Sequence, residues 1–346
     1  TRIGDEVVAS KRTTPESSDL QALSAVMRER HMRNLVMEVS SHAIALERIR
    51  GSHFSVVAFT NLSQDHLDFH KSMDDYFAAK SKLFTFEFAD LAVINIDDAY
   101  GVKLASATEL PVMTVSRHDH NATWHYVSIT RDYVGAHVAI RGSAGILIEG
   151  KVHLHGGYNF DNLLMAVAIA TESGIDPIDI AAILPQLTGA AGRLEAVRLG
   201  QNFTALVDYA HSPDAVARVL ETAHEITDGR VIAVLGCGGD RDASKRPLMG
   251  KALHEGADVA IFTSDNPRSE KPEAILVQMT LGLDIQEPNA IIEDRADAIR
   301  AAVNEAQAGD VVLVLGKGHE KGQEIAGVNQ PFDDRVELAK AIEDKK

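Results

Sequence analysis

The sequence places a carboxylate, an imidazole and an amine shortly after apolar runs that are typical of buried strands. The segment LVMEVSSH contains Glu38, the segment SVVAFTNLSQDHLDFH contains His66, and the helical pattern YFAAKSKLF contains Lys80. A carboxylate, an imidazole and an amine in this order are typical of a catalytic site. In open α/β sheets the ligand lies beyond the carboxyl ends of the strands, so we predict that the polar residues at these strand ends belong to a functional site.

Four more polar segments follow apolar runs in the second half of the chain. They are VDYAH, which contains Asp208 and His211, and then GCGGDRD, SDNPRSE and GKGHE. Between them, strand patterns and helix patterns alternate regularly. Such repetition requires right-handed crossovers and a mostly parallel sheet. We therefore predict a doubly wound, Rossmann-like domain in which the four segments converge on the carboxyl edge of the sheet.

The first half of the chain predicts a second α/β arrangement. Helical and strand patterns cover residues 18–31, 35–39, 56–60, 74–84 and 91–96. Apolar and polar residues then alternate over residues 124–156, which predicts an antiparallel hairpin insertion. Helical spacing returns afterwards, with Asp176 as a cap before Pro177. The segment TGAAGRLE follows, and we expect the domains to span residues 1–190 and 191–346.

Composition narrows the class of protein. The 346 residues carry a net charge of -16 and no basic patch, which argues against binding nucleic acid or a bilayer surface. No apolar run approaches the roughly 20 residues of a membrane span, and no signal peptide precedes the fold. The single cysteine, Cys237, excludes an internal disulfide and suits a reducing compartment. We expect a monomeric cytoplasmic protein and, because Thr1 is not an initiator residue, a fragment.

Two glycine motifs do not carry the function that each suggests by itself. GCGGDRD is not the GxGxxG fingerprint of dinucleotide binding, which disfavours an oxidoreductase. Residues 145–151 spell GxxxxGK, but Val152 stands where a phosphate loop needs Ser or Thr for magnesium. This segment also lies in the predicted hairpin rather than between a strand and a helix, so we reject it as a phosphate loop.

Taken together, the motifs resemble those of the Mur ligases, the ATP-dependent amide ligases that build the peptide of peptidoglycan. The motifs are TTPESSD, MEVSSH, TNLSQDHLDFH, AAKSKLF, GYNFDN, GRLE, VDYAHSPDA, GCGGDRD, DNPRSE and GKGHE. Within the family they are most similar to the ligases that extend UDP-N-acetylmuramoyl-L-alanyl-D-glutamate (UDP-MurNAc-L-Ala-D-Glu). The resemblance implies part of the central ATPase domain followed by the C-terminal amino-acid-binding domain. The family's GTxGKT-type phosphate loop and its uridine-nucleotide domain are missing from the sequence, so we expect the chain alone to be inactive.

The resemblance assigns three residues to magnesium. The family phosphorylates a substrate carboxylate with ATP, and an incoming amine then displaces the phosphate. Metal ions and cationic groups must neutralise the charge of that transfer. Glu38 and His66 match Mg²⁺ ligands, and Lys80 matches a lysine whose carbamylation supplies anionic oxygens. Without the motif, Lys80 is an ordinary exposed helix lysine.

Four residues match contacts to ATP. Asn162 lies on the adenine side, Arg193 matches a phosphate-neutralising arginine, and Asp208 with His211 match the ribose side. Because one nucleotide would then contact both domains, ATP binding would be linked to domain closure. Two alternatives stay open: Asn162 or Asn159 is a helix cap, and Arg193 with Asp208 forms an ion pair between the domains.

Residues at the start of the chain match the site for the muramoyl dipeptide. They are Thr13, Thr14, Ser40 and Arg48, whose hydroxyls and guanidinium suit an acidic ligand. The sequence departs from the family at Leu46, where some relatives have glutamine, so one substrate contact is weakened. Thr14, which precedes a proline, is otherwise only a turn residue of extended geometry.

The motif DNPRSE indicates which amino acid is added. It matches the branch of the family that uses meso-diaminopimelate, which is lysine with one more carboxylate. An arginine can bind that carboxylate through two parallel hydrogen bonds. The matching residues are Asp265, Asn266, Arg268, Arg241, Gly316 and Glu320, of which Glu320 suits the distal ammonium. The alternative is a plain turn at residues 265–267 followed by a solvated arginine.

Two other functions remain open. One is another amide ligase of the superfamily, such as a folylpolyglutamate synthetase, although DNPR and GKGHE together argue against it. The other is a non-catalytic remnant that keeps the amino-acid pocket without turnover. The missing phosphate loop favours the remnant, and the upstream coding sequence would distinguish a remnant from a fragment.

Overall fold

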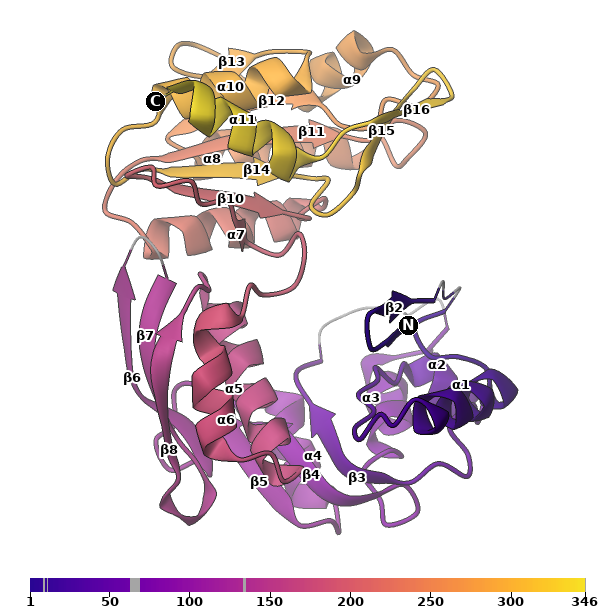
Figure 1. Ribbon diagram of the computed structural model, residues 1–346. Helices are drawn as coiled ribbons and strands as arrows, with labels where there is room; N and C mark the ends of the chain where they lie inside the picture. The colour runs from indigo at the N-terminus through magenta and orange to yellow at the C-terminus, as the bar shows by residue number, and fades with distance from the viewer. Residues whose placement is uncertain (9, 11, 63–68, 133–134, 346) are drawn as a thin grey trace. The chain divides into compact units, whose positions relative to one another are not determined.

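The structure is a computed structural model that describes residues 1–8, 10, 12–62, 69–132 and 135–345 (Figure 1). The chain divides into two compact units. The first comprises Thr1–Val127, Ile140–Ile148 and Asp161–Ile180, and the second comprises Ser128–Ala139, Glu149–Phe160 and Ala181–Lys346. Whether the functional domains divide at residue 190 stays a prediction. None of the described helices is long and apolar enough to cross a membrane.

A sheet of six strands in the order β3-β4-β5-β6-β7-β8 organises the first part of the chain. Strands β3 to β6 are parallel, whereas β6, β7 and β8 are joined by connections too short for anything but antiparallel neighbours. The predicted hairpin is therefore a three-stranded meander that continues the sheet. The elements are β1 (Arg2–Ile3), β2 (Glu6–Val7), α1 (Ser17–Glu29), α2 (Ser41–Ala45), β3 (Phe54–Phe59), α3 (Met73–Ser81), β4 (Ala89–Asn95), α4 (Ala99–Ala107), β5 (Val112–Ser116), β6 (Trp124–Asp132), β7 (Gly135–Arg141), η1 (Ser143–Gly145), β8 (Leu147–Val152), α5 (Gly157–Glu172), α6 (Pro177–Ile183) and η2 (Leu184–Gln186).

Helices α3, α4 and α6 each begin after a short polar side chain that caps the first turn. Ser72 accepts a hydrogen bond from the backbone of Asp75 at the start of α3, and Asp98 accepts two at the start of α4. The predicted cap of α6 is confirmed, because Asp176 accepts a hydrogen bond from the backbone of Ile178 at 2.8 Å. Such caps satisfy backbone N–H groups that the first helical turn leaves unpaired.

The strand predicted at residues 35–39 is wrong. Residues 32–40 form no strand, and Leu35 and Val36 are 45% and 88% exposed. No strand among the described residues pairs with this segment, since the sheet begins at β3. A strand needs a neighbouring strand to satisfy the hydrogen bonds of its backbone groups. The apolar pattern by itself was therefore not enough to form a strand.

The second part of the chain confirms the doubly wound prediction. Its sheet has the order β13-β12-β11-β14-β10-β9, parallel throughout except for the short β9. Helices α7, α8 and α9 pack on one face, and α10 and α11 pack on the other (Figure 1). The elements are β9 (Glu195–Ala196), β10 (Thr204–Asp208), α7 (Pro213–Glu225), β11 (Val231–Cys237), α8 (Lys245–Gly256), β12 (Val259–Ser264), α9 (Pro272–Met279), β13 (Ala290–Ile291), α10 (Arg295–Glu305), β14 (Val311–Leu315), β15 (Gly322–Ile325), β16 (Val328–Pro331) and α11 (Asp334–Lys345).

Side chains along each strand alternate between the two faces of this sheet, and this alternation fixes the register. In β10, Leu206 enters the cluster under α7 to α9, whereas Ala205 and Val207 enter the cluster under α10 and α11. A shift by one residue would exchange the two faces. The register aligns Asp208 with Leu315, so the parallel strands end together and their following loops share one edge.

Candidate functional site

A pocket of about 440 Å³ lies at the carboxyl edge of the second sheet. The loops after β10, β11, β12 and β14 all contribute to it, so the predicted convergence of the four polar segments is confirmed. Its lining consists of Tyr209, His211, Gly236, Cys237, Gly238, Arg241, Asp242, Lys245, Arg246, Met249, Asp265, Asn266, Arg268, Gly316 and Glu320.

Two glycines let the backbone approach Asp265 closely. A Cβ on Gly316 would lie 2.7 Å from Asp265 Oδ2, and one on Gly236 would lie 2.7 Å from the Asp265 backbone nitrogen. Gly316 also has a φ of +109°, which side chains rarely allow. Burial raises the pKa of Asp265, and the nearby cations Arg295 and Lys317 oppose that rise.

A buried lysine that the sequence analysis did not select holds two predicted residues together. Lys317 is fully buried, and its Nζ donates to Asn266 Oδ1 at 3.0 Å and lies 3.3 Å from Glu320 Oε2. Asn266 Nδ2 in turn donates to Glu320 at 2.9 Å. A buried cation needs such partners, so Lys317 fixes the amide and the carboxylate at the pocket. The sequence feature that could have identified Lys317 is its position in GKGHE, next to Gly316.

The loop GCGGDRD is held by a second buried cation. Arg246 forms two hydrogen bonds to the carboxylate of Glu270, at 2.7 and 2.8 Å, and donates to the Gly238 carbonyl at 3.1 Å. These hydrogen bonds lower the pKa of Glu270 to about 2. Glu270 also accepts from the Asp240 backbone at 2.6 Å. The pair therefore fixes the loop, while the predicted Arg241 is exposed at the pocket.

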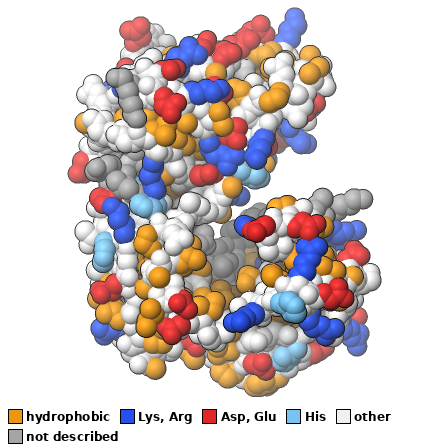
Figure 2. Space-filling view, in the orientation of Figure 1, with side chains coloured by type: hydrophobic (Ala, Val, Ile, Leu, Met, Phe, Trp, Pro, Cys, Tyr) orange, Lys and Arg blue, Asp and Glu red, His pale blue; other side chains and the backbone are white. Residues whose placement is uncertain are grey.

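The pocket differs in charge from the chain as a whole. Four lining residues are basic, namely Arg241, Lys245, Arg246 and Arg268, and three are acidic, namely Asp242, Asp265 and Glu320. The chain carries a net charge of -16, and acidic and basic side chains are interspersed over most of the face in Figure 2. A pocket with both signs of charge suits a ligand that carries both carboxylates and ammonium groups.

The residues predicted to contact ATP in this unit cluster around Tyr209. The Arg193 guanidinium lies 5.5 Å from the centre of the Tyr209 ring, and the His211 ring lies 4.6 Å from it. Asp208 is buried and accepts hydrogen bonds from the backbones of Leu194 and Ala210 and from the Tyr158 hydroxyl. Its contacts hold the GRLE segment against β10, and Arg193 and His211 are left exposed.

The two asparagines of GYNFDN differ in their surroundings. Asn159 is buried, and its Nδ2 donates to the carbonyl of His155 at 2.9 Å. Asn162 lies about one turn further along α5 and is exposed. Asn159 therefore has a structural contact, while Asn162 keeps a side chain available to a ligand.

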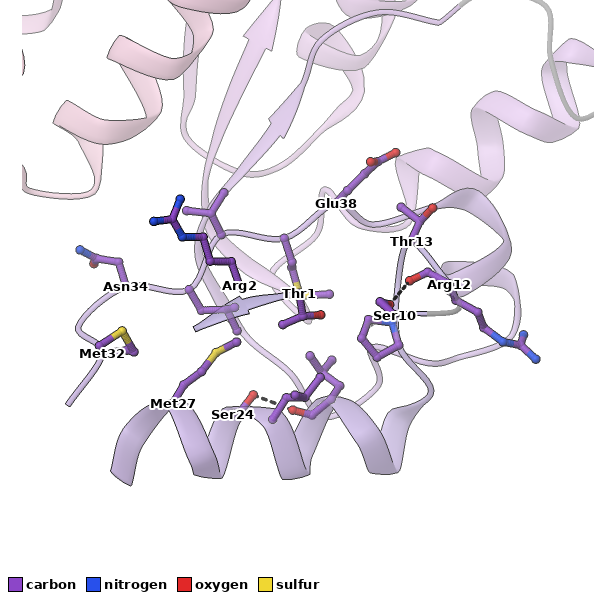
Figure 3. Close-up of a pocket in the computed structure, with 16 residues that line it drawn as sticks. Thr1, Arg2, Ser10, Arg12, Thr13, Ser24, Met27, Met32, Asn34 and Glu38 are labelled. Carbon is purple, nitrogen blue, oxygen red and sulfur yellow. Dashed lines mark hydrogen bonds between the residues drawn. The ribbon is translucent and has the colours of Figure 1, made fainter. Parts of the chain in front are cut away.

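The residues predicted to hold the dipeptide lie close together in the first unit. The Thr14 hydroxyl donates to the Glu38 carbonyl at 2.9 Å and accepts from the Ser40 backbone at 3.0 Å. Arg48 is buried and lies 3.2 Å from Glu16. A neighbouring pocket of about 480 Å³ has Glu38 and Thr13 at one end and Met27 and Met32 at the other (Figure 3).

The structure describes two of the three residues predicted to bind magnesium, Glu38 and Lys80. Glu38 presents an exposed carboxylate, which is a ligand that Mg²⁺ prefers. Lys80 lies near the end of α3 with its Nζ 5.2 Å from the centre of the Tyr76 ring, and it fits a metal only if carbamylated. His66 lies outside the described residues. Within the described part of the chain, no group of three His, Cys, Asp or Glu residues could hold a metal.

The fold and the pocket define a two-unit α/β protein with a pocket of mixed charge at the carboxyl edge of its second sheet, and comparisons with known proteins define its family. Residues 1–170 match the Mur ligase middle domain, and residues 192–318 match the glutamate ligase domain of Mur ligases. Two similar curated proteins are named UDP-N-acetylmuramoyl-L-alanyl-D-glutamate--2,6-diaminopimelate ligase. The one from Streptomyces coelicolor is 48% identical over 99% of this chain and 69% of its own length, and the one from Corynebacterium glutamicum is 44% identical over 100% and 68%. The chain belongs to the Mur ligase family.

Solved structures agree with this assignment. A structure of a UDP-N-acetylmuramoyl-L-alanyl-D-glutamate--2,6-diaminopimelate ligase has a TM-score of 0.75 and 37% identity, over 96% of this chain and 69% of that one. The folylpolyglutamate synthase of Mycobacterium tuberculosis, complexed with ADP, has a TM-score of 0.55 and 20% identity, over 76% of this chain and 60% of that one. The second similarity shows the fold alone.

Proposed function

We propose that this chain belongs to an ATP-dependent ligase that joins meso-diaminopimelate to UDP-MurNAc-L-Ala-D-Glu. The pocket at the carboxyl edge of the second sheet carries the proposal, because it brings Asn266, Arg268 and Glu320 together. Diaminopimelate has two carboxylates and two ammonium groups, and lysine lacks one of the carboxylates. An arginine beside an acidic residue suits the distal end of diaminopimelate. The names of the similar curated proteins support the same substrate.

In the proposed reaction, ATP phosphorylates the D-glutamate carboxylate of the dipeptide, and an amine of diaminopimelate then attacks that carbonyl and releases phosphate. Thr13, Thr14, Ser40 and Arg48 would bind the dipeptide, and Asn162, Arg193, Asp208 and His211 would contact ATP. Mg²⁺, when bound, would neutralise phosphate charge. Glu38, His66 and carbamylated Lys80 are the residues proposed to hold it.

Binding of amino acids to the 346-residue chain tests the substrate. Isothermal titration should show meso-diaminopimelate binding at least about tenfold more tightly than L-lysine, because charge-assisted hydrogen bonds to one carboxylate contribute about 1.5–3 kcal/mol. Equal binding of the two amino acids, tighter binding of lysine, or no binding of either would contradict the proposed substrate.

A further inference from the structure

The hairpin β15–β16 lies directly after GKGHE and packs against the segment that contains DNPR. Its strands pair antiparallel from Gly322 with Pro331 to Ile325 with Val328. The turn residues Ala326 and Gly327 have φ values of 50° and 76°, as a two-residue turn of this kind requires. The sequence analysis did not predict this hairpin.

The backbone of the hairpin holds the backbone of Arg268. The Arg268 N–H donates to the Glu324 carbonyl at 2.9 Å, and the Ala326 N–H donates to the Arg268 carbonyl at 2.7 Å. Arg268 has a φ of 53°. A residue other than glycine keeps this left-handed conformation only where its surroundings hold it. The hairpin supplies those surroundings.

The same hairpin also holds the two residues at the start of DNPR. Gln323 Nε2 donates to the Asp265 carbonyl at 2.7 Å. The Glu324 N–H donates to Asn266 Oδ1 at 2.9 Å. Asp265, Asn266 and Arg268 are therefore all fixed by successive residues of β15.

The Arg268 guanidinium is held from two sides. Its Nη1 donates to the Gly239 carbonyl at 2.6 Å, and its Nε lies 3.5 Å from Glu324 Oε2. The atoms in these two contacts are Nε and Nη1. The Glu324 carboxylate lies on the edge of the guanidinium that Nε shares with one N–H of Nη2, and the second N–H of Nη2 points away from this edge.

We propose that Glu324 is a positioning residue for Arg268 and thereby contributes to selectivity for an amino acid with a second carboxylate. The inference rests on the proposed function, in which Arg268 binds that carboxylate. With Nε and Nη1 restrained, the guanidinium keeps one orientation in which an N–H of Nη2 points away from Glu324, and less conformational freedom is lost when the ligand binds. In the alternative role, the Glu324 carboxylate competes with the ligand for Arg268. Removing the carboxylate would then strengthen diaminopimelate binding rather than weaken it.

The test compares Glu324→Ala and Glu324→Gln by isothermal titration of the 346-residue chain with meso-diaminopimelate and L-lysine. Both variants keep the backbone contacts of β15, so they isolate the carboxylate. Glu324→Ala should weaken diaminopimelate binding by about fivefold, the upper range for a half-exposed ion pair, and leave lysine binding within about twofold. Glu324→Gln retains an accepting oxygen and should lie between wild type and Glu324→Ala.

Glu305→Ala is a matched control. Glu305 has a side-chain exposure of 42%, against 43% for Glu324, and it also pairs with an arginine, Arg230, at 2.7 Å. That pair lies at the start of β11, whereas the pocket lies beyond the end of this strand. A double-mutant cycle completes the design: in an Arg268→Ala background, Glu324→Ala should have no further effect on diaminopimelate binding.

Tighter diaminopimelate binding by Glu324→Ala would show competition and overturn the proposal. Unchanged binding, equal weakening of both amino acids, or the same effect in the Arg268→Ala background would overturn it as well. A wild-type chain that does not prefer diaminopimelate would overturn the proposed function before any variant is compared. The positioning role would then be overturned as well, because it rests on that function.

Discussion

Arg295 and Asp334 form a fully enclosed ion pair between the first residues of α10 and α11. The Arg295 Nε and Nη2 atoms each donate to one oxygen of the Asp334 carboxylate at 2.7 Å. Arg295 also donates to the carbonyls of Ser264 and Leu315, at 3.2 and 2.8 Å. These carbonyls end β12 and β14, so one guanidinium fixes the two strands from which the DNPR and GKGHE loops leave.

Removing that guanidinium should strongly destabilise the second unit. Arg295→Ala leaves the Asp334 carboxylate buried without its partner, and we expect a loss of about 3–5 kcal/mol in the free energy of unfolding. Urea-induced unfolding measures the change. Arg300→Ala on the same helix removes an exposed pair with Asp297 and should cost less than about 1 kcal/mol. Similar losses in the two variants would refute the structural role of Arg295.

Arg268→Ala should reduce the selectivity between amino acids. Diaminopimelate binding should weaken by about tenfold or more, because two charge-assisted hydrogen bonds are lost. Lysine has no carboxylate at that position, so its binding should change little. Titration with both amino acids gives the ratio, and Arg230→Ala, at the opposite end of β11, is the control. An unchanged ratio would remove Arg268 from the proposed amino-acid site.

Carbamylation of Lys80 can be detected without turnover. In ¹³C-labelled bicarbonate, the chain should show a carbamate resonance that is absent from Lys80→Ala. Lys82→Ala changes an exposed lysine two residues away and should keep the resonance. The signal should increase with pH, because only the deprotonated amine reacts. A spectrum that is the same for wild type and Lys80→Ala would contradict the modification.

His155 should make stability depend on pH. Burial lowers the pKa of His155 from 6.5 to about 4, so the unfolded chain takes up a proton at a higher pH than the folded chain. Stability associated with this residue is therefore present above about pH 6.5 and is lost as the pH falls towards 4. His155→Leu should reduce that loss by up to about 3 kcal/mol.

Urea-induced unfolding between pH 4 and pH 7 checks this prediction. His137→Gln, at an exposed position of β7, is the control. If His155→Leu and the wild type lose stability in parallel over that window, the buried imidazole is not the cause.

The sequence by itself determined the doubly wound domain and the edge at which its polar segments meet. The local features of the sequence are the strand and helix periods, the Asp176 cap and the order of the βα units. Parallel strands with short loops allow few other arrangements. The positions of Asp265, Asn266 and Arg268 at the end of β12 follow directly from that pattern. The roles of these residues stay predictions.

Only the tertiary structure decided which distant segments become neighbours. Residues 35–39 have a strand pattern but form no strand, because no described strand lies beside them. Lys317 and Arg295 are fully buried, and no local pattern distinguishes them from exposed cations. Glu324 reaches Arg268 only because β15–β16 packs against DNPR. Such contacts depend on residues far apart in the chain, and a local sequence pattern does not contain that information.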